Sequence, residues 1–108
     1  MGVLVIGADK VKQIKSTLFE VGATKVIHFD CRKKNFYKRK IPSDIDMVVF
    51  ITDYLSHNKM EVFKKEAKKK KIPAVYAKYS KNDLADKIKR AITDDNESYS
   101  NKKIDFGK

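Results

Sequence analysis

Two runs of consecutive apolar residues set the fold class of this chain. The first covers residues 3–6 (Val-Leu-Val-Ile), and the second ends the segment 46–51 (Asp-Met-Val-Val-Phe-Ile). A strand without polar alternation is buried on both faces, which is typical of a parallel sheet covered by helices. Residues 24–29 and 74–77 form two further candidate strands, the latter entered through Pro73. The sequence therefore predicts four strands.

Three intervening stretches place apolar residues three or four positions apart, which is the spacing of one face of a helix. Their apolar stripes are Val11, Ile14, Leu18 and Val21; Met60, Phe63 and Ala67; and Leu84, Ile88 and Ile92. Gly22 follows the first stripe, where a helix end favours a left-handed residue. Ser56 is a suitable N-cap for a helix from 56 to about 70, and Ser80 with Asp83 resembles a capping box before the third.

This alternation of strands and helices predicts a single small α/β domain with three layers and a parallel sheet. Strand order 2-1-3-4, a shortened flavodoxin-like or Rossmann-like sheet, lets helices cover both faces and puts the switch point between strands one and three. The polar, basic segment 30–44 has room for a short helix. We assign residues 1–93 to the domain and 94–108 to a polar C-terminal tail.

Composition excludes several classes of protein. The chain has 108 residues and one cysteine, which rules out an intramolecular disulfide framework and a multi-cysteine zinc cage. No apolar run approaches the ~20 residues of a membrane span, and no signal-peptide core is present, so we expect a cytoplasmic protein that does not enter the membrane. A net charge of +11 favours polyanionic partners but names no function.

Ligands of such sheets bind beyond the carboxyl ends of the strands, and polar residues gather there in this sequence. Our candidate ligand-binding residues are Gly7, Asp9, His28, Asp30, Arg32, Thr52, Asp53, Ser56 and His57. Residues 7–9 lack the further glycines of a dinucleotide-binding turn, so a tight turn with Asp9 as the helix N-cap is the plainer interpretation. Ser56 and His57 open a helix, whose free N–H groups suit an anion.

Two other kinds of site remain open from the residues alone. His28, Cys31 and His57 together offer ligands for a metal ion or haem iron if the fold brings them close. The thiol of Cys31 follows Asp30 and precedes three cations, so exposure there would lower its pKa and allow redox sensing. A structural histidine and a bystander thiol are the plainer interpretations of these residues.

A basic segment with two aromatic residues offers a candidate nucleic-acid interface. Cations interleaved with aromatic side chains can hold phosphates and stack on bases. The residues are Arg32, Lys33, Lys34, Phe36, Tyr37, Lys38, Arg39 and Lys40. A second cluster holds six lysines within 64–71, where a solvated helix face is the plainer interpretation.

Three segments resemble a bacterial family known as domain of unknown function 2325. They are His-Phe-Asp-Cys-Arg at 28–32, Ile-Pro-Ser-Asp-Ile-Asp at 41–46, and Thr-Asp-Tyr-Leu-Ser-His-Asn-Lys-Met at 52–60. The resemblance covers about residues 1–92 and implies an α/β fold. It also implies that the functionally important residues are His28, Asp30, Arg32, Thr52, Asp53, Ser56 and His57. Cys31 stands where the family often has glycine. The resemblance assigns no reaction and no cofactor.

The sequence favours a binding or regulatory module over an enzyme. Arg32 is expected to pair with a small anionic ligand beside the helix N-terminus at Ser56 and His57, with Asp30 and Asp53 orienting neighbouring donors. A nucleic-acid accessory protein that uses the 32–40 loop is the alternative from a different class. A small sheet with two edges also allows a homo-oligomer.

Overall fold

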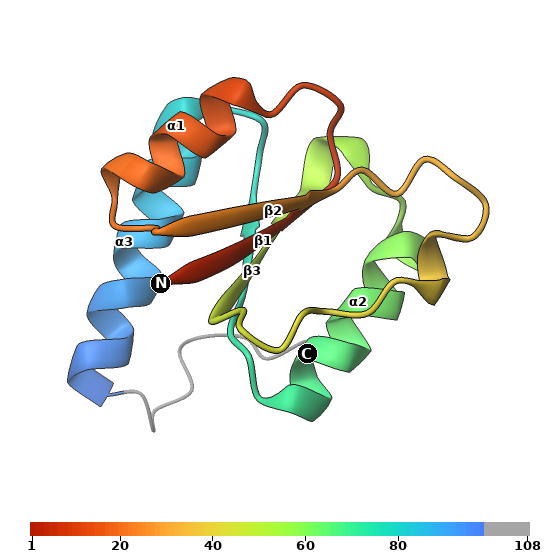
Figure 1. Ribbon diagram of the computed structural model, residues 1–108. Coiled ribbons are helices and arrows are strands. Elements are labelled where there is room, and N and C mark those ends of the chain that lie inside the picture. Colours follow the sequence, from red (N-terminus) through yellow and green to blue (C-terminus); the bar gives the residue numbers. More distant parts are fainter. Residues whose placement is uncertain (99–108) are drawn as a thin grey trace.

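The computed structural model describes the backbone of residues 1–98 and the side chains of residues 1–92. Four strands alternate with helices along the chain (Figure 1). The elements are β1 (Gly2–Ile6), α1 (Lys12–Glu20), β2 (Lys25–Phe29), the 3-10 turn η1 (Phe36–Lys38), β3 (Met47–Ile51), the 3-10 turn η2 (Thr52–Tyr54), α2 (His57–Lys70), β4 (Ala74–Ala77) and α3 (Lys81–Ser98). All four predicted strands are present, and η1 is the short helix expected between β2 and β3.

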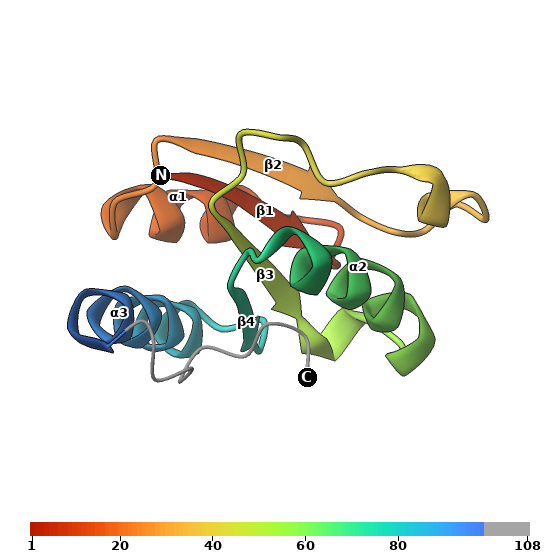
Figure 2. The same ribbon diagram turned by 90° about the horizontal axis from the view of Figure 1, so that it is seen from below.

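The four strands form one parallel sheet in the order β2-β1-β3-β4, as the sequence predicted. Leu4 at the centre of β1 lies beside Ile27 of β2 and Val48 of β3. Helices α1 and α3 pack together on one face, and α2 covers the other face with the β2–β3 loop beside it (Figures 1 and 2). The order therefore reverses between β1 and β3, which makes the carboxyl ends of these strands the switch point.

Successive side chains of the central strands enter two separate cores, because neighbouring residues of a strand point to opposite faces. Val3 and Val5 pack with α1 and α3, whereas Leu4 and Ile6 pack with α2. Every residue of β1 and β3 is buried, which is why these segments read as unbroken apolar runs. The α2 core also takes in residues of the β2–β3 loop, chiefly Cys31, Ile41 and Ile45.

The predicted helix ends are confirmed in most details. Ser56 Oγ accepts a hydrogen bond from the Lys59 N–H at 3.2 Å, and Gly22, with φ +115°, follows the last turn of α1. Ser80 Oγ accepts from the Asp83 N–H at 3.3 Å. The Asp83 carboxylate reaches past Ser80 to the Lys78 N–H at 2.8 Å, and that bond, with help from Lys87, lowers the pKa of Asp83.

Helix α3 continues to Ser98, beyond the boundary at residue 93 expected from the sequence. Polar residues at 94–98 offer no apolar stripe, so the sequence pattern ends before the helix does. The division into a domain and a tail stays a prediction, and residues 99–108 lie outside the described part of the chain.

Among the helices described, none combines the length and the apolar character that a membrane crossing requires.

Candidate functional site

A turn of two left-handed residues follows β1, and the side chain of His28 holds it. Gly7 has φ +102° and Ala8 has φ +71°, so the carbonyl groups of both turn toward β2. His28 Nε2 lies 2.9 Å from each of these two oxygens. Because carbonyl oxygens only accept hydrogen bonds, we assign the proton to Nε2. His28 therefore fixes the turn, and its Nε2 has no free lone pair for a metal ion.

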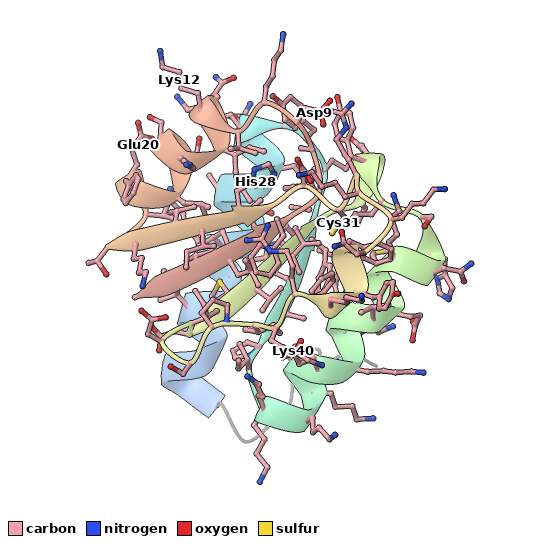
Figure 3. The ribbon with its side chains drawn as sticks, turned by 45° about the vertical axis from the view of Figure 1, so that its right-hand side comes forward. Asp9, Lys12, Glu20, His28, Cys31 and Lys40 are labelled. Atoms are coloured by element: carbon pink, nitrogen blue, oxygen red, sulfur yellow. The ribbon has the colours of Figure 1, made fainter. Side chains whose placement is uncertain are left out.

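The turn places the side chain of Asp9 next to that of Arg32. Asp9 Oδ1 lies 3.2 Å from Arg32 Nη1, and Asp30 Oδ1 accepts the Arg32 N–H at 3.1 Å. The N-cap of α1 is Val11 and makes no side-chain capping bond, so the expectation that Asp9 caps this helix is wrong. The reason is the left-handed backbone of Gly7 and Ala8, after which α1 begins only at Lys12. Figure 3 shows Asp9, His28 and Cys31 at this end of the sheet.

Cys31 is buried in the α2 core, contrary to the exposed thiol that redox sensing requires. Its side chain is only 3% exposed, because a left-handed backbone (φ +61°) turns it inward from a polar segment. Burial raises the pKa of the thiol from 9.0 to about 11, although Lys59 opposes this shift. The left-handed conformation is also one that glycine adopts freely, which agrees with the glycine often found here in the family that the sequence resembles.

This burial predicts slow thiol chemistry. A pKa near 11 in place of 9.0 lowers the thiolate fraction at pH 8 about 100-fold, because thiolate is the reactive form. We expect Cys31 to react with iodoacetamide at least that much more slowly in the folded protein than in urea, and the rate to rise with pH up to about 11. Mass spectrometry of quenched samples measures both rates. Equal rates in the two states would contradict a buried thiol.

Thr52 and Asp53 connect β3 to the end of β4. Thr52 Oγ1 donates to the Ala77 carbonyl at 3.4 Å, and Asp53 Oδ2 accepts the Tyr79 N–H at 3.0 Å. Leu55 then folds back over the switch point, since a Cβ atom added at Gly7 would lie 2.9 Å from Leu55 Cγ. The Leu55 side chain thus covers the turn that follows β1.

His57 stands apart from the group around Arg32. Its side chain is 79% exposed, and its Nε2 lies 3.7 Å from Glu61 Oε2 one turn along α2. No hydrogen bond or ion pair among the described side chains joins His57 to Arg32 or His28. Across residues 1–92, no three His, Cys, Asp or Glu side chains are grouped to hold a metal ion, so the structure does not assemble His28, Cys31 and His57 into a ligand set.

A cavity opens beside the switch point, between the end of β2, the β2–β3 loop and α2. It encloses about 140 Å³ and combines aromatic side chains with polar ones. The lining residues are Phe29, Asp30, Cys31, Lys33, Asn35, Phe36, Arg39 and Phe63. Sequence reasoning missed Phe29, Asn35 and Phe63 as site residues. The aromatic residues within the basic 32–40 segment were the one available signal.

Contacts with α2 hold the loop over this cavity. Phe63 of α2 is fully buried and packs against Phe29 and Phe36, with ring centres 5.8 and 6.3 Å away. Lys59 Nζ donates to the Cys31 carbonyl at 2.8 Å and lies 5.5 Å from the ring centre of Phe36. The guanidinium of Arg39 sits 3.9 Å above the ring centre of Phe29. The loop is therefore a wall of the cavity with a defined position.

The residues of the proposed nucleic-acid loop divide into two sets. Arg32 pairs with Asp9 although its side chain is 67% exposed, and Phe36 packs inward on Phe63 and lines the cavity. Tyr37 is 53% exposed and meets Phe36 edge-to-face at 5.9 Å. The remaining cations, Lys33, Lys34, Lys38, Arg39 and Lys40, are exposed.

The fold and the placement of this cavity define a small α/β domain with a doubly wound, four-stranded parallel sheet. The chain belongs to DUF2325, a family of uncharacterised proteins conserved in bacteria, whose family model matches residues 2–91. That match spans the whole sheet and most of α3. Searches of the curated proteins and of the solved structures returned no match.

Proposed function

We propose that this domain binds a small organic anion in the cavity between the β2–β3 loop and α2. The main support for this proposal is the composition of the cavity lining, in which two cations, Lys33 and Arg39, lie next to three aromatic rings. The cations supply charge for a carboxylate, and the rings supply an apolar surface for the rest of the ligand. The ligand class is the one expected from the sequence, a small anion. The proposed binding position differs, because it lies at the end of β2 and not at the N-terminus of α2.

The charge of the lining favours a monoanion. Lys33 and Arg39 face one carboxylate, that of Asp30, so the lining carries one net positive charge. Asp30 is already engaged by the Arg32 N–H, which leaves the two cations for a ligand. Arg39 offers a planar fork of donors that matches a carboxylate, and its position over Phe29 holds that fork beside the ring.

The volume of the cavity limits the ligand to a small molecule. About 140 Å³ resembles the cavities of about 150 Å³ that accept a benzene ring, and it is below the range of about 300–1,000 Å³ for drug-sized ligands. A nucleotide is too large to be enclosed. An aromatic or short aliphatic carboxylate fits both the volume and the charge.

The chemistry of the lining supports binding over catalysis. Cys31 is the nucleophilic side chain of the lining, and its raised pKa keeps the thiol protonated near neutral pH. A protonated thiol beside aromatic rings acts as a small apolar group. We therefore assign Cys31 to the floor of the site.

A thermal-shift series tests this proposal with benzoate, acetate and inorganic phosphate as probes. We expect benzoate at 100 times its Kd to raise Tm by about 10 °C, with smaller shifts from acetate and phosphate. Lys33→Gln should abolish the benzoate shift, because it removes one of the two cations. Lys34→Gln is the matched control, since this neighbour loses the same charge without lining the cavity.

Two outcomes would count against the cavity as the site. One is that none of the three probes raises Tm. The other is equal loss in Lys33→Gln and Lys34→Gln, which would indicate a non-specific effect of charge. A third variant, His57→Ala, should retain the full shift. Loss of the shift in this variant would indicate that the anion binds at the N-terminus of α2, and it would overturn the proposal.

A further inference from the structure

We infer that the β2–β3 loop and the outer side of α2 form one basic surface that binds single-stranded nucleic acid. This inference concerns the outward-facing cations of the same two segments. Two of them, Lys33 and Arg39, also line the small-anion cavity, so the variants that test the inference leave both unchanged. It rests on three features of the described residues: the attachment of the loop to α2, the exposed cations without acidic partners, and one exposed aromatic ring among them.

The loop is attached to one side of α2, and at about 100° per residue Lys65 and Lys69 lie on the outward side of the helix next to it. The Ile41 N–H donates to Glu66 Oε2 at 3.0 Å, and Lys70 Nζ donates to the Ile41 carbonyl at 3.0 Å. Phe36 packs on Phe63 at the other end of the contact. Figure 3 shows Lys40 beside α2, in agreement with these bonds.

These two segments carry charge equal to the whole net charge of the protein. Residues 32–40 contribute +6 without an acidic residue, and residues 64–71 contribute +5 from six lysines and one glutamate, against a net charge of +11. The two acidic residues near this face pair with Lys64 and Lys70. Nine exposed cations have no ion pair with a described residue: Lys33, Lys34, Lys38, Arg39, Lys40, Lys65, Lys68, Lys69 and Lys71.

The shape and the chemistry of this surface favour an extended polyanion with flat rings. Helix α2 has 14 residues and is therefore about 21 Å long, enough for several successive phosphates. Tyr37 stands exposed among the cations, braced edge-to-face by Phe36, as a base-stacking platform requires. A lipid surface would call for several exposed apolar side chains, and Tyr37 is the exposed large apolar residue of the described loop and α2.

Fluorescence anisotropy with a labelled oligothymidylate of about 20 nucleotides tests the inference on the full chain. We expect log Kobs to fall linearly with log salt concentration, with a slope of about −0.7 for each phosphate contacted. Lys34→Gln/Lys38→Gln in the loop and Lys65→Gln/Lys69→Gln in α2 should each make the slope about 1.4 less steep. Lys81→Gln/Lys89→Gln on α3 is the matched control, because these exposed lysines lie across the sheet.

The aromatic part of the inference has its own variants. Tyr37→Ala should weaken binding about 10-fold, and Tyr37→Phe should restore it, because both rings stack on bases. Circular dichroism checks that each variant is folded. The inference is overturned if the α2 variant and the α3 control have equal slopes, or if Tyr37→Ala binds as tightly as the unaltered protein. Binding to phosphatidylserine vesicles without binding to the oligonucleotide would overturn it in favour of a membrane surface.

Discussion

Replacing Gly7 with alanine is expected to destabilise the fold by about 3 kcal/mol. Two effects act together at this position. The backbone has φ +102°, which an L side chain rarely adopts, and the added Cβ would lie 2.9 Å from Leu55 Cγ and 3.2 Å from the Ile51 carbonyl oxygen. Urea denaturation followed by circular dichroism measures the loss, which should also lower Tm by more than about 10 °C.

Gly22 provides a matched control for this change. Its φ of +115° is equally unfavourable for alanine, but nothing lies within 4 Å of an added Cβ. Gly22→Ala should therefore cost only about 1 kcal/mol, from the backbone alone. The difference between the two variants isolates the collision with Leu55. Equal losses would mean that Leu55 moves aside freely and does not close the switch point.

Replacing Phe63 with alanine is expected to cost about 3–5 kcal/mol, a large share of the stability of a domain of this size. Phe63 is completely buried and contacts both the last residue of β2 and the loop, through Phe29 and Phe36. Its loss removes one wall of the cavity and one attachment of the loop to α2. Urea denaturation gives the free energy, and the benzoate shift of the remaining folded protein should fall as well.

Phe19→Ala is the control for removing a ring without opening the core. Phe19 lies on α1 and is 50% exposed, so its loss should change the free energy of unfolding by less than about 1 kcal/mol. Phe63→Leu separates packing from ring chemistry, because it keeps an apolar side chain at the position. A cost of less than about 1 kcal/mol for Phe63→Ala would contradict the packing described for the α2 core.

Sequence pattern was sufficient to predict the fold, because each strand and helix carries its own local signal. The unbroken apolar runs in β1 and β3 reflect burial by helices on both faces, and Ser56 marked the start of α2. The end of α3 was missed because residues 94–98 have no apolar spacing. The assignment of Asp9 as an N-cap failed because the left-handed conformation of Ala8 has no local sign in the sequence.

The candidate site was predicted less well, since it depends on contacts between distant segments. The sequence placed His28, Asp30 and Arg32 at one edge, and the structure joins them to residues 7–9 through hydrogen bonds and an ion pair. It did not indicate that Cys31 points inward, because its neighbours are charged and only the backbone angle turns the side chain. The sequence did not indicate that Phe63 lines the cavity, because its place in the apolar spacing of α2 predicts only that it is buried.

The separation of charge across the sheet has a kinetic consequence. The loop and α2 carry the excess cations on one side, while α1 and α3 occupy the other (Figure 2). Because the excess charge is local, an approaching polyanion would be attracted to this side of the molecule more than to the other, within the Debye length of about 10 Å at 0.1 M salt. The protein would then meet a polyanion with this side first. Added salt should therefore lower the association rate constant more than it raises the dissociation rate constant.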